Sequence, residues 1–528
     1  MVTVLSVESY ITLLKTHVDT RYASRRREIK LFTKPSFDDA RPSKRPFFSI
    51  LDSLASICVP GRGIHVAVAL AVDGAVASLY VASGGGSTSG ELGIEEPLKA
   101  FIVPLLKDLW EKLRQLRDLD SNSTVATEKR KVLHAMLYES YFCKLKHGVG
   151  KKLRVCVQEV IQILEGQLHD SSGSTTVVSE DDYAEIHSLA ERLDDLFSST
   201  KSHAQDVAAY FVDLETRWIP RLRGNDNLLD RLDMISKSHS LLLRRYFEKL
   251  LTFQYHCHTI ISLAYSPRFK VLLDCALDVV PIPANRMNRE PITIDLDREL
   301  WRSAVQSTEL GYLSEADFDT IHEGWVQALF NNIKAKSPSP LLSWANEHDR
   351  KLVFSDLESN ASSPGYHPEC AVLCYLRQHG IHTYPYIGAS RDLCYGCDVF
   401  FSAYNSVSQW SQMNPTFYHR GSDGKVKLPW IMPPNENMCD AQGNLKAGEV
   451  SDEMMDILVK DLEGFAYETR WGRKEVPGWQ EDVVEVAKMK DGDTQQVVRK
   501  SCSSGRSRKL SKRWDFDDYP LTRINWGV

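Results

Sequence analysis

The chain has 528 residues, of which 43% are hydrophobic and 25% are charged. This length and composition are typical of a globular protein with a sizeable core and about two to four domains. The formal net charge of −6 excludes a general electrostatic attraction to nucleic acid or to acidic membranes.

The first residues and the cysteines indicate the compartment. Residues 1–19 lack the positively charged start and the small-residue cleavage site of a signal peptide. The longest apolar run, at residues 65–83, is interrupted by Asp73–Gly74, which argues against a transmembrane helix. The odd number of 11 scattered cysteines does not resemble a disulfide framework. We therefore expect an intracellular protein, cytoplasmic or nuclear and without a membrane partner, whose clustered cysteines are candidate metal ligands.

Two segments of the chain are densely basic. Residues 1–45 include the run Arg25–Arg27, and residues 499–513 hold seven lysines or arginines and no acidic residue. Such segments are typical of solvated arms, so we expect a basic, partly helical N-terminal arm and a basic, partly disordered tail. Nuclear targeting or electrostatic tethering is the alternative interpretation.

The first folded unit is predicted at residues 46–90. Residues 46–59 carry apolar side chains at helical spacing. Two β-prone runs follow, residues 64–72 and 75–81, on either side of the dipeptide Asp73–Gly74, which is a strong hairpin turn signal. The order is therefore helix, strand, strand.

The remainder of the chain is predicted in three parts. Residues 91–345 are mostly helical in period, with a proline-punctuated connector at residues 279–297. Residues 346–440 change to short alternating elements. Residues 441–528 hold one amphipathic helix, expected to begin at Ser451, and the tail.

Two stretches within residues 346–440 carry the chemistry. In "YHPECAVLCYLRQHG", residues 366–380, Pro368 suits the first turn of a helix and Gly380 suits its end. His367 and Glu369 then lie at the helix start, whereas Cys370 and Cys374 belong to the buried stripe.

The second stretch is predicted as a strand at residues 381–390 and a helix whose first turn holds Cys394 and Cys397, capped by Ser390 or Asp392. Two helix starts aimed at one point bring three zinc ligands together and leave the fourth position open for water. These ligands are His367, Cys394 and Cys397, and Glu369 is left free to move protons.

These residues resemble the signature of the cytidine deaminase-like superfamily, His-x-Glu followed by Pro-Cys-x-x-Cys. Here the motifs read "HPE" at residues 367–369 and "CYGC" at residues 394–397. Residues 360–435 are further similar to a deaminase-like branch common in fungi, in which "IGxSKxxCxxC" precedes "RGxHGK". The resemblance implies a zinc-dependent deaminase with one zinc ion, a catalytic water and Glu369 as the catalytic residue. It implies a nucleobase-containing substrate, free or in nucleic acid.

The resemblance also implies an α/β fold, an α-β-α sandwich whose elements run helix, strand, strand, zinc helix, strand, zinc helix. Because the helix and hairpin lie at residues 46–90, we expect a split core that continues at 346–440, with a large all-α insertion at 91–345 between its parts. Two positions depart from the superfamily pattern: Leu393 replaces a proline, and Ser83–Gly84 replaces an asparagine that contacts substrate.

Two alternatives to a catalytic zinc site stay open at this point. Cys439 is able to close a Cys3His site, which would make the protein a catalytically inactive, zinc-stapled scaffold. The cysteines are also compatible with core packing and no metal.

Residues 360–440 carry five basic and six acidic residues, so the expected site face has no basic footprint for nucleic acid. Within the branch pattern, Arg391 stands for a lysine and Asp423 for a histidine.

Overall fold

The structure is a computed structural model of the 528-residue chain. Two compact units are distinguished, Met1–Asp461 and Leu462–Val528, and the fold and site below belong to the first. The structure describes residues 6–12, 14–15, 45–59, 64–84, 98–144, 151–169, 180–198, 209, 240–282, 292–295, 297–299, 302, 314–335, 344–346, 351–354, 367–411, 416–428, 430–433 and 447–471.

The predicted helix and hairpin are confirmed. Helix α2 covers Arg45–Ile57, and strands β1 and β2 cover His65–Asp73 and Val76–Gly84. The two strands pair antiparallel over their whole length, from His65 with Gly84 to Asp73 with Val76. Gly74 has a φ of 54°, a left-handed conformation that the tight turn requires and that glycine adopts without a Cβ clash.

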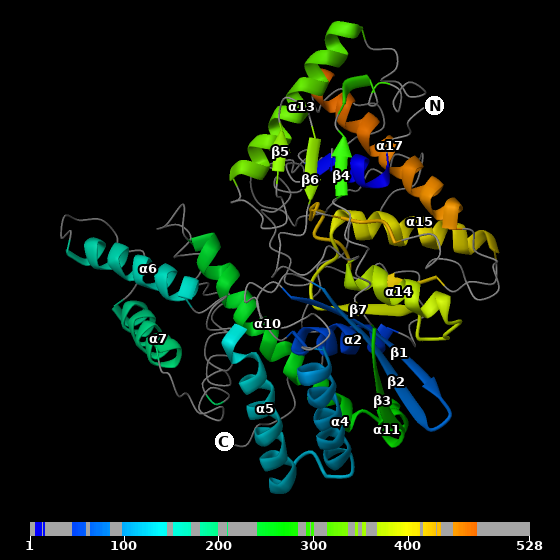
Figure 1. Cartoon of the computed structure of the whole chain (residues 1–528). Helices are drawn as coiled ribbons and strands as arrows, with labels where there is room; N and C mark the ends of the chain where they lie inside the picture. Colours follow the sequence, from blue (N-terminus) through cyan, green and yellow to red (C-terminus); the bar gives the residue numbers. More distant parts are fainter. Residues whose placement is uncertain are drawn as a thin grey trace, which may run out of the picture. The chain divides into compact units, whose positions relative to one another are not determined.

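A five-stranded sheet joins this hairpin to elements near the other end of the chain. Its strand order is β3-β2-β1-β7-β8. Strand β7, Tyr386–Ala389, pairs antiparallel with β1, and β8, Tyr418–His419, pairs parallel with β7. Figure 1 shows the blue β1 and β2 beside the yellow β7. The mixed sheet with flanking helices confirms the expected α/β fold class, split along the sequence.

The structure corrects the prediction of a connector at residues 279–297. Strand β3, Ala276–Pro281, pairs parallel with β2 at the edge of the main sheet. Strand β4, Ile292–Asp295, joins β5, Trp344–Asn346, and β6, Lys351–Phe354, in a second sheet of order β4-β6-β5. Proline does not exclude a strand here, because Pro281 is the last residue of an edge strand, where no ladder donor is lost from the interior.

Most of the region between β2 and β4 is helical, as expected. Its elements are a short π-helical turn η1 (Leu98–Ile102), α4 (Val103–Arg117), α5 (Thr124–Lys144), α6 (Lys151–His169), α7 (Glu180–Ser198), α10 (Ser240–Tyr265) and α11 (Pro267–Asp274), followed after β4 by α13 (Glu315–Ala335).

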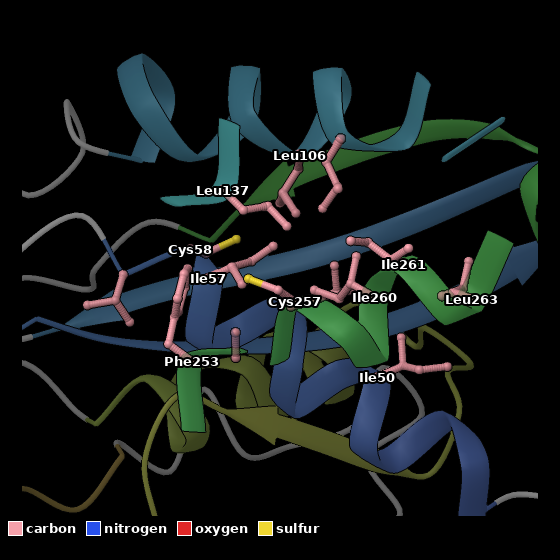
Figure 2. Packing of buried hydrophobic residues seen from close by; sticks show 14 of the residues in the cluster. Ile50, Ile57, Cys58, Leu106, Leu137, Phe253, Cys257, Ile260, Ile261 and Leu263 are labelled. Atoms are coloured by element: carbon pink, nitrogen blue, oxygen red, sulfur yellow. The ribbon is translucent and has the colours of Figure 1, made fainter. Parts of the chain in front are cut away.

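One hydrophobic core connects the helices from α4 to α11 to the sheet. It includes Leu51 of α2, Val68 of β1, Leu106 of α4, Leu137 of α5 and Ile260 of α10. Figure 2 shows side chains from α2, α4, α5 and α10 meeting beside the hairpin. The helices therefore share the core of the sheet, although sequence reasoning treated them as a separate insertion.

The N-terminal segment differs from the expected solvated arm. Residues 7–12 and 14–15 are helical, and Val7, Tyr10, Ile11 and Leu14 are buried. Their spacing of three and four residues forms one apolar helical face, which packs into the protein. The basic runs at 25–27 and 499–513 lie outside the described residues.

The last described helix, α17, covers Ala447–Trp471 and so begins four residues before the predicted Ser451. Glu449 in its first turn complements the positive end of the helix dipole. Among the residues that the structure describes, no helix is both long enough and apolar enough to cross a membrane.

Candidate metal centre

Helix α14, Pro368–Gln378, presents His367 at its N-terminal end, as predicted. His367 is the N-cap residue, with extended backbone angles, and Pro368 follows in the first helical position, where its missing N–H is not needed. Gly380, with a φ of 61°, lies just beyond the helix and permits its left-handed ending. The sequence thus fixes where the helix starts, and with it the place of His367.

Helix α15, Tyr395–Ser411, supplies the two cysteines from its N-terminal end. The backbone N–H of Asp398 donates to the carbonyl oxygen of Cys394 at 3.0 Å, so Cys394 immediately precedes the helix and Cys397 lies in its first turn. The ring of Trp430 packs so closely on Gly396 that a Cβ added there would lie 2.7 Å from the indole nitrogen.

The predicted caps of α15 have other roles. The Ser390 hydroxyl oxygen accepts from the backbone N–H of Val66 at 3.0 Å, which fastens the end of β7 to β1. The Asp392 carboxylate pairs with Arg420 at 3.3 Å. Both residues lie too far before Cys394, the residue that actually precedes the helix, to act as its cap.

The structure brings the three predicted ligands together. The Nδ1 atom of His367 lies 3.0 Å from the sulfur of Cys397 and 3.2 Å from that of Cys394. The two sulfurs are 3.5 Å apart. All three donor atoms lie within 4.8 Å of one another, which makes this group able to hold a metal ion.

The donor set suits zinc. One imidazole nitrogen and two sulfurs are ligands that zinc prefers, and tetrahedral bond lengths place such donors about 3.5 to 3.8 Å apart. The observed separations of 3.0 to 3.5 Å are within a few tenths of an ångström of that range. Three protein donors leave one tetrahedral position, which is the pattern of catalytic zinc sites.

The protonation of the thiols also favours a cation. Although burial alone raises the pKa of Cys394, hydrogen bonding from Cys397 and the nearby His367 outweigh it and hold that pKa well below its usual range. Burial and the neighbouring sulfurs raise the pKa of Cys397 well above its usual range. The lowered pKa of Cys394 favours the thiolate, which is the form of cysteine that binds a metal cation.

Glu369 lies at the second position of α14, beside His367, and its side chain is only 5% exposed. Burial raises the pKa of this carboxyl, and the His367 imidazole opposes that rise. Burial also lowers the pKa of His367, but Cys394 outweighs this effect and the pKa is raised overall. Burial thus favours the protonated form of this carboxyl, which suits a group that holds and passes on a proton.

The two cysteines that sequence reasoning assigned to the core differ in their surroundings. Cys374 is buried in the core as expected. Cys370 is also buried, but its sulfur lies 3.7 Å from that of Cys397, a closeness that the helical pattern did not reveal. Cys439, the other candidate for a fourth ligand, lies outside the described residues.

The two departures from the expected pattern have local explanations. The backbone N–H of Leu393 donates to the carbonyl oxygen of Gly421 at 2.9 Å, a bond that proline could not make. Gly84, at the end of β2, packs on Pro368, where an added Cβ would lie 2.9 Å from the proline ring. The end of the hairpin therefore lies against the start of α14, next to His367.

Residues 421–427, here called the metal-site loop, lie next to Cys394. Backbone hydrogen bonds of 2.8 to 2.9 Å join the loop to Leu393 and to Tyr395, the two neighbours of Cys394. Gly421 and Gly424 adopt φ values of 111° and 62° that the loop needs. Sequence reasoning noted the glycines of this segment only as part of a motif.

The N-terminal helix supports this loop. The Nζ of Lys15, a buried residue, donates to the carbonyl oxygen of Val426 at 2.7 Å. The carboxylate of Glu8 accepts from the backbone N–H of Met432 at 2.9 Å. The periodic apolar residues of the segment were the signal that could have predicted this packing.

Comparison with known proteins agrees with these residues. Residues 366–434 match the family model of the OTT_1508_deam-like deaminases. Curated proteins and solved structures give no significant match. The matched segment contains all three members of the His-Cys-Cys group and Glu369. Residues 366–434 thus support a deaminase-like family for the part of the chain that holds a group compatible with zinc.

Proposed function

We propose that this protein is a zinc-dependent deaminase that hydrolyses the exocyclic amine of a nucleobase-type substrate. The observation that carries the proposal is the His367, Cys394 and Cys397 group, with donor atoms 3.0 to 3.5 Å apart and the buried Glu369 beside it. The match of residues 366–434 to a deaminase-like family supports the same reaction.

The roles of the residues follow from their positions. Zinc held by His367, Cys394 and Cys397 would supply a water of lowered pKa for attack on the ring carbon that bears the amine. Glu369 accepts a proton from the attacking water and delivers it to the ring nitrogen. Glu369 then takes the remaining proton from the hydroxyl added to the ring carbon and passes it to the amine, the carbonyl forms as the C–N bond breaks, and one water is consumed for each ammonia released.

The test is replacement of Glu369 by glutamine. We expect Glu369→Gln to retain zinc, because the three ligands are unchanged, and to lose turnover by about 100-fold or more, the typical contribution of a positioned acid and base. Zinc content and ammonia release from nucleosides, nucleotides and single-stranded DNA and RNA are the measurements. Glu449→Gln, the same change at an exposed first-turn glutamate of α17, is the control. Unchanged ammonia release by Glu369→Gln would refute the assignment.

A structural zinc site is the second candidate, and one distance favours it. The Cys370 sulfur lies 3.7 Å from Cys397, close to the separation of two sulfurs on one zinc ion. Cys370 would then fill the fourth position and leave a zinc-stapled scaffold without a catalytic water. Against this candidate, Cys370 does not belong to the group of donors that lie within 4.8 Å of one another.

The Cys370→Ser variant distinguishes the two candidates. We expect it to keep both zinc and ammonia release, whereas Cys397→Ser should lose both because it removes a ligand. Cys374→Ser, one turn further along α14, controls for the cost of a buried hydroxyl. Loss of zinc from Cys370→Ser, with zinc retained by Cys374→Ser, would establish the structural site instead.

We further propose the setting in which this site works. Reducing conditions in the cytoplasm or nucleus keep Cys394 and Cys397 available as metal ligands. The proposed deaminase core comprises residues 46–90 and 346–440, with residues 91–345 as the helical region between them, 1–45 before them and 441–528 after them.

A further inference from the structure

Two charged residues of the metal-site loop form an ion pair beside the metal centre. The Nζ of Lys427 lies 3.5 Å from the Asp423 carboxylate, and the other oxygen of that carboxylate accepts from the backbone N–H of Lys425 at 3.0 Å. Because the loop is bonded to both neighbours of Cys394, the pair has a fixed position relative to that ligand.

The pair is partly exposed, whereas Glu369 and the two cysteines of the centre are buried. The side chains of Asp423 and Lys427 are 25% and 32% exposed. By contrast, Glu369 is 5% exposed and Cys394 is 2% exposed. The pair is therefore more accessible to solvent than the buried carboxyl and thiols are.

The two charges act on different members of the centre. Asp423 interacts electrostatically with Cys394, whereas Lys427 interacts with His367 and Glu369. The backbone N–H of Asp423 also donates to the carbonyl oxygen of Leu393 at 2.9 Å, so Asp423 is joined directly to the residue next to Cys394.

We propose that Asp423 and Lys427 bind the substrate and select an uncharged nucleobase or nucleoside over its 5′-phosphate. This inference rests on the proposed deaminase function. The ammonium donates to a ring carbonyl, and the carboxylate accepts from a sugar hydroxyl or a ring N–H. Both groups therefore have partners on a neutral nucleoside.

The same pair opposes a phosphate. The charge of Lys427 is already compensated by Asp423, so little positive potential remains for a second anion. A phosphate bound by Lys427 would also lie beside the Asp423 carboxylate, and like charges brought together reduce affinity strongly. Asp423 is therefore the residue that makes the selection.

Binding to zinc-loaded Glu369→Gln protein tests this proposal, because that variant is expected to bind nucleosides without hydrolysing them. Cytidine, adenosine and their 5′-monophosphates are titrated by calorimetry. We expect at least one nucleoside to bind about tenfold or more tightly than its monophosphate. Adding Asp423→Asn should reduce that ratio about tenfold. The control is Asp108→Asn, which breaks a matched ion pair. Its carboxylate lies 3.4 Å from the Nζ of Lys112, which is also four residues further along the chain.

Three results would overturn the proposal: no nucleoside binds, the monophosphates bind as tightly as the nucleosides, or Asp423→Asn leaves the ratio within about twofold of its parent. Ammonia release by the wild-type protein is measured in parallel with the same compounds. Selective binding without ammonia release would count against the reaction alone, and ammonia release without selectivity would count against this inference alone.

Discussion

At the scale of single residues, Asp52 is a buried carboxyl that joins the two parts of the core. From α2, it accepts hydrogen bonds from the Tyr386 hydroxyl at 2.7 Å and from the backbone N–H of Ala389 at 3.0 Å. Both partners lie on β7, the strand that leads to Cys394. Burial raises the pKa of Asp52 to about 7, against the lowering effect of Arg420.

This pKa predicts how stability depends on pH. The folded protein holds the Asp52 proton up to about pH 7, whereas the unfolded chain releases it near pH 4. The free energy of unfolding should therefore fall as pH rises from about 4 to 7, by at most about 4 kcal/mol for this group. Asp52→Asn has no proton to release, so this part of the slope should disappear in urea unfolding.

The control is Asp278→Asn on β3, where the residue is exposed and the pH profile should follow that of the wild type. Parallel profiles for the wild type and Asp52→Asn would contradict the assignment of this slope to Asp52.

Sequence reasoning predicted the placement of the candidate site residues from their local spacing, whereas their roles stay a prediction. His367, Glu369, Cys394 and Cys397 stand at short spacings on helix starts, and the structure places the three ligand atoms together. The position of Cys370 beside Cys397 could not be predicted, because it depends on how α14 and α15 approach each other. The same holds for Asp52, whose partners are more than 300 residues away.

At the scale of elements, a close contact between α2 and β7 depends on one glycine. A Cβ added at Gly388 would lie 2.4 Å from the backbone carbonyl carbon of Leu51. Gly388→Ala should therefore force α2 and β7 apart and reduce the free energy of unfolding by about 1 to 3 kcal/mol or more. Gly324→Ala is the matched control, because no described atom beyond its own stretch of helix lies within 4 Å of the added Cβ.

The control should change stability in the opposite direction. Gly324 lies within α13, where alanine is favoured over glycine by about 0.5 to 1 kcal/mol. Chemical denaturation of both variants measures the two effects. Equal stability of Gly388→Ala and the wild type would show that α2 and β7 do not require this close approach.

The elements that were predicted correctly have strong punctuation in the sequence. Asp73–Gly74 marks the hairpin, and Pro368 with Gly380 marks both ends of α14. The prediction of a connector was wrong at β3 because the strand forms by pairing with β2, and that partner lies about 200 residues earlier. The start of α15 was also misplaced. Ser390 pairs with Val66 and Asp392 pairs with Arg420, and neither caps the helix.

At the scale of the whole molecule, the family resemblance of the motifs implied the α/β class, and the order of the predicted elements indicated the split core, with which the pairing of β1 with β7 agrees. Sequence periodicity could not show that α10 shares its core with α2. That contact includes a hydrogen-bonded pair, His256 and Ser53, with 2.9 Å between the ring nitrogen and the hydroxyl oxygen. The five-part division of the chain stays a prediction.

The pairing of β1 with β7 has a consequence for synthesis. Val68 is paired with Gly388, so the hairpin leaves the ribosome more than 300 residues before its neighbouring strand exists. At about 5 to 20 residues per second, that interval lasts roughly 15 to 60 seconds. During this time the open edge of β1 is a template for incorrect pairing with other chains. The helices made in the interval share one hydrophobic core with the hairpin, so they can bury its apolar side chains before the second part of the sheet is made.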